Sequence, residues 1–137
     1  MNILIVGGLG YLGVKLIENI NKIIPNNNIN VCDTEWFSHT NLENINKDSY
    51  KKIIIDKRSI REEHFKDIDV VIDLAAVSND VMGNSFEDAT NDINYLSTVK
   101  LAKDSVKYGV KKFIFASSCS IYGTADDKPR VEESEVL

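Results

Sequence analysis

The sequence predicts an α/β fold with a doubly wound parallel sheet and helices on both of its faces. Short runs rich in β-branched residues alternate with longer amphipathic stretches along almost the whole chain, which is typical of successive β-α-β units. The short runs are continuously apolar, as expected of strands that are covered on both faces. With 137 residues, the chain is long enough for one domain with a substantial core and too short for two ordinary ones.

Five apolar runs are the expected strands, and a helix is expected after the first of them. The strands are predicted over residues 3–6, 29–33, 52–56, 69–75 and 112–117. Between the first two strands, apolar residues recur every three or four positions from Leu12 to Ile24, which predicts an amphipathic helix. This helix should end near Pro25, because proline does not continue a helix.

Two more helices are expected further along the chain. Ser59, followed by Glu62 three residues later, forms a capping box and predicts a short helix over 60–66. The longest helix is predicted over 86–108, where an apolar stripe repeats at helical spacing. Gly109 supplies its C-terminal stop, because glycine readily adopts the left-handed conformation that ends many helices.

Charge and composition disfavour several classes of partner and site. A net charge of -5 with no basic stripe argues against nucleic acid and anionic membranes, which attract clusters of Lys and Arg. No apolar stretch approaches the length of a membrane span, and the short N-terminal apolar run lacks the basic residues of a secretory signal, so a cytoplasmic protein is expected. Cys32 and Cys119 lack metal-ligand spacing; both are expected to be reduced and buried, with no metal site.

Three glycines stand where the first strand should pass into the first helix. Gly7, Gly10 and Gly13 follow the apolar run in a G-x-x-G-x-x-G pattern. In such a loop the first glycine allows a tight turn, the second lets a pyrophosphate approach the backbone, and the third lets helix and sheet pack closely. The phosphates would then meet the N–H groups and the positive dipole end of the helix. The pattern therefore predicts a Rossmann-type dinucleotide site.

Asp33 strengthens this prediction. It lies 20 residues after Gly13, at the end of the second expected strand, where an acidic side chain can accept hydrogen bonds from an adenosine ribose. Thr34 and Glu35 follow it, so no Arg or Lys stands beside it to receive a 2′-phosphate. NAD is therefore favoured over NADP.

Taken together, the motifs resemble those of the extended short-chain dehydrogenase/reductases, specifically the NAD-dependent sugar-nucleotide epimerase/dehydratase group. The residues that carry the resemblance are GGLGYLG (7–13), VCD (31–33), IIDKR (54–58), DLAAVS (73–78), INYLSTVKLA (93–102) and FIFASSCSIYG (113–123). They span nearly the whole chain in the order of the family. The resemblance implies NAD as cofactor and a nucleotide-sugar as substrate.

The resemblance also implies roles for individual residues in the cofactor site. These residues are Gly7, Gly10, Tyr11, Leu12, Gly13, Asp33, Asp56, Lys57, Leu74, Ala75, Ala76, Asn94 and Ser117. Asp56 and Lys57 should border the adenine, and the small residues at the end of the fourth strand should let the backbone approach the cofactor. Asn94 should support the site from behind.

Ser118 is the implied catalytic residue, because it matches the serine whose hydroxyl bonds the reacting sugar oxygen. The dehydratases of this group resemble one another in an Asp-Glu pair directly after that serine, whereas this chain has Cys119 and Ser120. Elimination of water needs a general acid and a base, so dehydration is disfavoured and transient oxidation of the sugar by an epimerase is favoured. A sugar-nucleotide ketone reductase and a non-catalytic NAD-sensing module remain alternatives.

The family's catalytic base, a tyrosine followed four residues later by lysine on a helix, has no counterpart here. Tyr11 with Lys15 and Tyr108 with Lys112 match the spacing, but the first pair lies in the glycine loop and first helix, and the second spans a helix end. We therefore expect NAD binding without turnover from this chain. Whether it is a truncation or naturally short stays open.

The resemblance divides the chain into two parts. Residues 1–123 are expected to form the NAD-binding domain, and residues 124–137 a polar loop or tail that leads toward a catalytic helix and a substrate domain outside this sequence. A homodimer through helix 86–108 is also implied.

Overall fold

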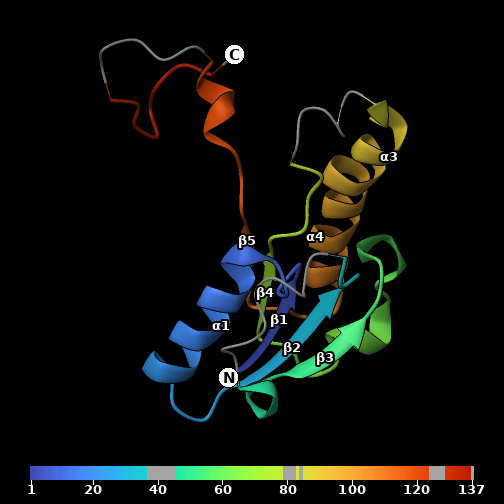
Figure 1. Cartoon of the computed structure of the whole chain (residues 1–137), viewed down its shortest axis with the longest axis vertical. Helices are drawn as coiled ribbons and strands as arrows, with labels where there is room; N and C mark the ends of the chain where they lie inside the picture. The colour runs from blue at the N-terminus through green and yellow to red at the C-terminus, as the bar shows by residue number, and fades with distance from the viewer. Residues whose placement is uncertain (37–45, 79–82, 84, 124–128, 137) are drawn as a thin grey trace.

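The computed structural model describes residues 1–36, 46–78, 83, 85–123 and 129–136, and it confirms the predicted fold class. Five parallel strands form one sheet in the order β3-β2-β1-β4-β5 (Figure 1). The strands are β1 (Asn2–Val6), β2 (Asn28–Asp33), β3 (Lys51–Ile54), β4 (Val70–Asp73) and β5 (Lys112–Phe115). All five predicted strands are present. The order reverses between β1 and β4, which creates the crevice where open α/β sheets bind ligands.

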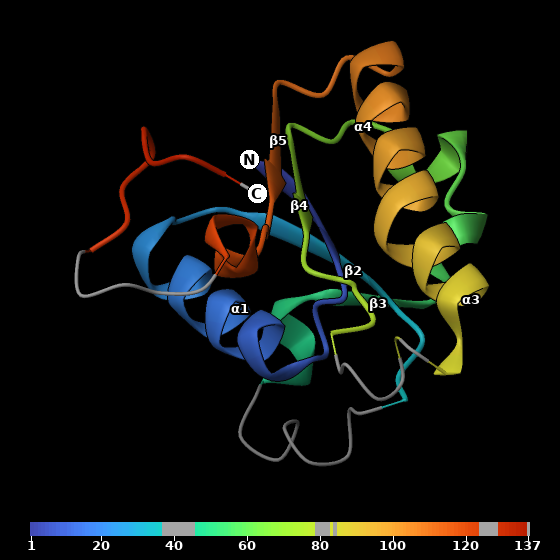
Figure 2. The same cartoon turned by 90° about the horizontal axis from the view of Figure 1, so that it is seen from above.

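Helices cover both faces of the sheet (Figure 2). The α1 helix (Tyr11–Ile23) covers one face, and α3 (Glu87–Asn91) and α4 (Ser97–Lys107) lie on the other. Alternate side chains of β1 serve the two cores: Ile3 and Ile5 pack with α1, whereas Leu4 and Val6 pack on the α4 side. All four side chains are at most 1% exposed. This burial on both faces explains why the strand sequences are continuously apolar.

The long helix differs from the prediction in one detail. The helical path from α3 to α4 is unbroken, but residues Asp92–Leu96 form a π-helical turn between them. Gly109 has a φ of +77°, and it ends the helix as the sequence indicated. A π turn inserts one extra residue into the helix and often marks a functional site, because it re-aims the side chains that follow.

The expected helix over 60–66 is wrong. The segment instead makes two 3-10 turns, Lys57–Ser59 and Glu62–Phe65, and Ser59 lies inside the first turn rather than capping a helix. The reason is burial, because Ile60 and Phe65 are each 1% exposed and both pack into the core on the α4 side. Two short turns bring both side chains to that core.

The chain leaves the sheet after β5. A 3-10 turn, Cys119–Tyr122, follows, and the red C-terminal segment lies apart from the sheet in Figure 1. Residues 129–136 contain no helix or strand, while 124–128 and 137 lie outside the described residues, and the division of the chain at residue 123 stays a prediction. The expectation that both cysteines are buried is half wrong: Cys32 is buried, but Cys119 is exposed on this segment.

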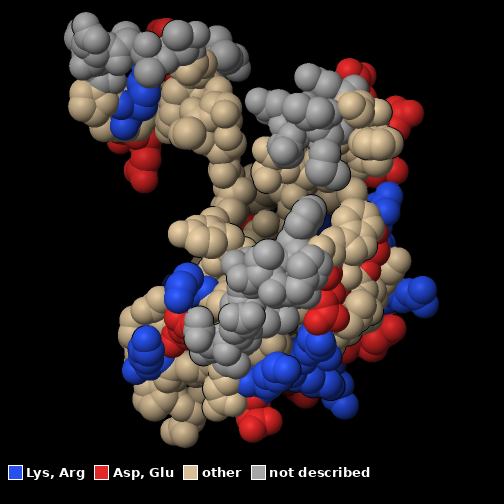
Figure 3. Space-filling model, in the orientation of Figure 1, with Lys and Arg blue, Asp and Glu red and all other residues tan. Residues whose placement is uncertain are grey.

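Charged side chains of both signs share the face seen in Figure 3. Basic residues gather around β3, where Lys52 pairs with Glu35 at 2.6 Å and Arg58 pairs with Asp56 at 2.7 Å. Within the described ranges, no helix has the length and apolar character needed to cross a membrane.

Candidate functional site

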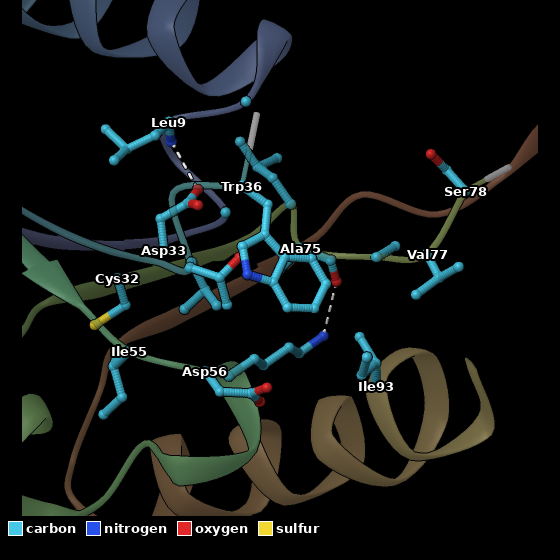
Figure 4. A pocket seen from close by; sticks show the side chains of 17 residues that line it. Leu9, Cys32, Asp33, Trp36, Ile55, Asp56, Ala75, Val77, Ser78 and Ile93 are labelled. Atoms are coloured by element: carbon cyan, nitrogen blue, oxygen red, sulfur yellow. Dashed lines mark hydrogen bonds between the residues drawn. The ribbon is translucent and has the colours of Figure 1, made fainter. Parts of the chain in front are cut away.

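A pocket opens at the carboxyl edge of the sheet, where β1, β2 and β4 end (Figure 4). It is lined by Val6, Gly7, Leu9, Gly10, Cys32, Asp33, Thr34, Trp36, Ile55, Asp56, Lys57, Leu74, Ala75, Ala76, Val77, Ser78 and Ile93. These residues come from the glycine loop, from the ends of three other strands and from the π turn. The position is the one that the reversal of strand order predicts for a ligand.

The glycines of the loop serve different purposes. Gly7 has a φ of +79°, and a Cβ there would lie 2.7 Å from the Ala75 backbone nitrogen. At Gly13 the Cβ would lie 2.4 Å from the Gly8 carbonyl oxygen. A Cβ at Gly10 would meet only the Gly7 carbonyl oxygen, at an ordinary 3.5 Å. The packing of the chain itself therefore requires glycine at positions 7 and 13 but not at position 10, which lines the pocket and caps α1.

Gly8 also belongs to the glycine loop, but its close packing against the sheet was not predicted from the sequence. A Cβ there would lie 2.8 Å from Val31 Cγ1. The loop therefore packs against β2 as well as against the wall formed by the residues after β4. The adjacent glycines at positions 7 and 8 were the available signal for this second close approach.

Asp33 is held with its carboxylate at the pocket (Figure 4). Its Oδ2 accepts the Leu9 N–H at 2.9 Å, and its Oδ1 accepts the Glu35 N–H at 2.7 Å. Leu9 is 1% exposed, so its buried side chain fixes the first of these donors. A carboxylate oxygen accepts more than one hydrogen bond, so Asp33 retains acceptor capacity for ligand hydroxyls.

Asp56 lines the opposite side of the pocket and is tied to Arg58. One carboxylate oxygen accepts from the Arg58 N–H at 2.8 Å and from Nε at 2.9 Å, and the other accepts from a terminal guanidinium nitrogen at 2.7 Å. These bonds to Arg58 hold the pKa of Asp56 below its ordinary value. Asp56 is therefore ionised at neutral pH and caps the 3-10 turn that follows β3.

The residues after β4 form one wall of the pocket, and Asn94 supports that wall. Asn94 Oδ1 accepts the Val77 N–H, and Asn94 Nδ2 donates to the Val77 carbonyl oxygen, each at 2.8 Å. Asn94 lies in the π turn and does not line the pocket itself. Asn94 therefore holds the wall from outside the pocket, and its role in cofactor binding stays a prediction.

Lys57 lines the pocket, as the sequence predicted, but its side chain is almost completely buried. Its side chain is only 4% exposed, and its ammonium forms an ion pair with Asp73 at 2.7 Å behind the wall. Its charge is thus paired with Asp73 rather than open to solvent, and a place beside the adenine stays a prediction. The cause of the burial is the 3-10 turn that begins at Lys57 and directs this side chain inward.

Several predicted residues lie outside the pocket lining. Tyr11 and Leu12 are 75% and 63% exposed on the first turn of α1. Ser117 and Ser118 are exposed beyond β5, and Ser118 Oγ accepts the Ser120 N–H at 3.2 Å. The pocket therefore brings together Gly7 and Gly10 of the glycine loop, Asp33, Asp56, Lys57 and residues 74–76, but not the two serines.

Trp36 and Cys32 are lining residues that the sequence analysis missed. Trp36 is 63% exposed, and no motif marked it, although its place just after β2 was the available signal. Burial, and then the charge of Asp33, raises the pKa of Cys32 to about 12. Cys32 therefore contributes a neutral thiol to the pocket rather than a nucleophile.

Comparison with known proteins confirms the predicted family resemblance. Residues 4–136 match the 3-beta hydroxysteroid dehydrogenase/isomerase family. A putative UDP-glucose 4-epimerase of Methanocaldococcus jannaschii is 33% identical over 139 residues, which cover 98% of this chain and 44% of the relative.

Solved structures agree. A UDP-N-acetylglucosamine 4-epimerase from Methanobrevibacter ruminantium M1, in complex with UDP-N-acetylmuramic acid, has a TM-score of 0.84 at 28% identity, over 99% of this chain and 44% of that one. A dTDP-glucose 4,6-dehydratase from Bacillus anthracis, in complex with NAD, shares the fold with a TM-score of 0.82 at 23% identity, over 100% of this chain and 43% of that one. This chain thus spans less than half the length of each relative.

Proposed function

Because the chain belongs to the 3-beta hydroxysteroid dehydrogenase/isomerase family, we propose that it binds NAD as the cofactor-binding portion of a nucleotide-sugar epimerase. The observation that carries the proposal is the pocket, which joins Gly10 at the start of α1 with the carboxylate of Asp33. A dinucleotide needs both features, because one holds the pyrophosphate and the other holds the ribose.

The chain's own residues fit this cofactor. Gly10 is not required by the packing of the chain, yet it leaves bare backbone at the pocket, where a pyrophosphate could approach the first N–H groups of α1. Asp33 would accept from the adenosine ribose, and Asp56 would border the base. Asp33 would also repel the 2′-phosphate of NADP. Bound NAD would supply the hydride acceptor, while these residues hold and orient it.

Epimerisation is the reaction that we favour within the family. The similarity alone does not separate the two reactions, because 4-epimerases match 98% and 99% of this chain and a 4,6-dehydratase matches 100%. Cys119 and Ser120, which follow Ser118, lack the acid and base that dehydration requires. We assign Ser118 the role of hydrogen-bonding the reacting sugar oxygen. It stands after β5, and because its Oγ already accepts from Ser120, it can donate its own proton to a substrate.

Trp36 provides the test of cofactor binding, because it lines the pocket and is the only tryptophan of the chain. We expect NAD to change its fluorescence in a saturable manner and to bind more tightly than NADP. Asp33→Asn should weaken NAD binding about ten- to a hundredfold, since a charged hydrogen bond contributes roughly 1.5–3 kcal/mol. Asp48→Asn, at an exposed position in the 3-10 turn Lys47–Ser49, is the matched control and should leave the affinity unchanged.

Calorimetric titration of the same samples supplies an independent reading. A folded parent chain without saturable NAD binding by either method would contradict the proposal. If NAD binds but UDP-glucose and UDP-N-acetylglucosamine change neither its affinity nor its redox state, cofactor binding stands, and the epimerase assignment must be tested in a longer protein.

We also propose a homodimer through the helical segment 86–108. Phe86, Tyr95 and Leu96 expose 62%, 61% and 49% of their surface there. Sedimentation equilibrium should show a dimer that Tyr95→Asp weakens, and a parent chain that is monomeric at high concentration would contradict this proposal. The cytoplasmic location expected from the sequence stays a prediction.

A further inference from the structure

The pocket wall, residues 74–78, leaves the sheet almost at once. The Leu74 N–H still donates to the Val6 carbonyl oxygen at 2.8 Å, but β4 itself ends at Asp73. After Leu74, the backbone of the wall forms hydrogen bonds with side chains from other elements. The Ala75 carbonyl oxygen accepts from Lys57 Nζ at 3.1 Å, and Asn94 holds both backbone polar groups of Val77.

Lys57 is the centre of this support. Its ammonium donates to Asp73 Oδ2 at 2.7 Å, to Thr98 Oγ1 at 2.6 Å and to the Ala75 carbonyl oxygen. An ammonium has three protons, so all of its donors are used inside the protein. The Thr98 hydroxyl in turn donates to Asp73 Oδ2 at 3.1 Å. The network joins the end of β3, the end of β4 and the first turn of α4.

The place of Ala75 matters because Ala75 touches the glycine loop. A Cβ at Gly7 would lie 2.7 Å from the Ala75 nitrogen and 2.8 Å from its Cα. With so little space between them, a displaced Ala75 would shift the glycine loop or open a gap beside it. The distance between the wall and the loop is thus fixed through Ala75, and Figure 4 shows a dashed bond from below ending at this residue.

We propose that Lys57, through Asp73 and Thr98, is a positioning residue that sets the wall against the glycine loop and so sets the affinity of the pocket for a dinucleotide. The inference rests on the proposed NAD binding. Direct contact between Lys57 and a phosphate is disfavoured, because the side chain is 4% exposed and its three donors are occupied. Replacing both members of a buried ion pair by neutral residues of similar volume often leaves stability unchanged, so such a replacement can separate positioning of the wall from general stabilisation.

The test removes the donors without leaving a lone buried charge. In Lys57→Met/Asp73→Asn the pair becomes neutral at similar volume, and position 73 keeps an acceptor for the Ala75 N–H. Thr98→Val removes only the hydroxyl and is the second variant. Ser105→Ala is the matched control, because Ser105 is 2% exposed on the same α4 helix and its hydroxyl bonds the Leu101 carbonyl oxygen at 2.7 Å, outside the network.

NAD affinity, urea unfolding and amide hydrogen exchange should be measured on the 137-residue chain. We expect the double variant to bind NAD and ADP-ribose about tenfold more weakly and Thr98→Val about threefold, with Ser105→Ala unchanged. Exchange of the Val77 amide should rise in the double variant at an unfolding midpoint close to that of the parent. General destabilisation would not produce this local change.

Either variant can overturn the inference. A folded double variant whose NAD affinity stays within about twofold of the parent and whose Val77 exchange is unchanged would show that the pair is structural only. If the double variant does not fold, NAD affinity and Val77 exchange are compared between Thr98→Val and the parent, and no change in either would overturn the inference. If the parent does not bind NAD, the proposed function fails, and the Val77 exchange alone decides whether Lys57 positions the wall.

Discussion

Gly13 on α1 lies directly against Gly8 of the glycine loop, with room for no side chain between them. A Cβ at Gly13 would meet the Gly8 carbonyl carbon at 2.5 Å and its oxygen at 2.4 Å. The obstacle is backbone, which cannot move aside as a flexible side chain can. The close approach of α1 to the sheet therefore depends on this glycine, as the sequence pattern indicated.

Gly13→Ala and Gly10→Ala should consequently behave in opposite ways. Gly13→Ala should lower the free energy of unfolding by about 1–3 kcal/mol, the usual cost of overpacking. Gly10→Ala should cost less than about 1 kcal/mol, because its φ of -74° suits any residue and its Cβ meets only one atom, at 3.5 Å. It should still weaken NAD binding. Urea unfolding and NAD titration test both variants, and equal destabilisation would contradict the distinction.

Asn94→Ala should loosen the pocket wall without unfolding the chain. It removes two 2.8 Å hydrogen bonds, both to Val77, and each net bond contributes about 0.5–1.5 kcal/mol. We expect weaker NAD binding and faster exchange of the Val77 amide. Asn94→Asp should rescue only partly, since a carboxylate accepts the Val77 N–H but cannot donate to its carbonyl oxygen. Asn91→Ala, at an exposed position on the same helical segment, is the control and should change neither reading.

The sheet and the glycine loop were predictable because local sequence determines them. A run such as Ile3–Val6 is apolar throughout because both faces are covered, and the spacing from Gly7 to Gly13 follows from the hand-over between strand and helix. Asp33 could be assigned for the same reason, since it ends the strand beside β1. Each of these features rests on residues that are close together in sequence or on adjacent strands.

The support of the wall was not predictable from local sequence. Lys57 was expected to border the adenine, and its partners Asp73 and Thr98 could not be inferred because they lie 16 and 41 residues further along the chain. The side chain of Lys57 points inward because Lys57 begins a 3-10 turn. The sequence predicted no turn there, only a short helix over 60–66. The π turn at Asn94 was likewise hidden, because an extra residue in a helix leaves no clear mark on apolar spacing.

The two cysteines should differ sharply in reactivity. Cys32 is 1% exposed, and its pKa is raised to about 12, first by burial and then by the charge of Asp33, whereas Cys119 is exposed. Alkylation of the folded chain at mildly alkaline pH should therefore modify Cys119 alone, because the thiolate is the reactive form. Mass spectrometry locates the label. Cys119→Ser should abolish fast labelling and Cys32→Ala should not, while prompt labelling of Cys32 would contradict the buried site.

Asp69 should make the stability of the chain depend on pH. It joins three strands at the edge of the sheet remote from the pocket, because Oδ1 accepts from Lys111 Nζ at 2.6 Å and Oδ2 accepts the Asn2 N–H at 2.9 Å. The bond from Lys111, followed by that from Asn2, holds the pKa of Asp69 below its ordinary value of 3.8. Its stabilising effect is therefore fully present above that ordinary value and is lost as the pH falls through the lower folded value.

Asp69→Asn should accordingly unfold at a lower urea concentration than the parent near pH 7, and the difference should shrink as the pH falls below 3.8 and through the lower folded pKa of Asp69. The amide keeps an acceptor for Asn2 but loses the charge that pairs with Lys111. Asp48→Asn, at an exposed position in the 3-10 turn Lys47–Ser49, is the matched control and should follow the parent at every pH. If the difference in urea midpoint between Asp69→Asn and the parent stays constant or grows in acid, the ionised carboxylate is not what stabilises this edge of the sheet.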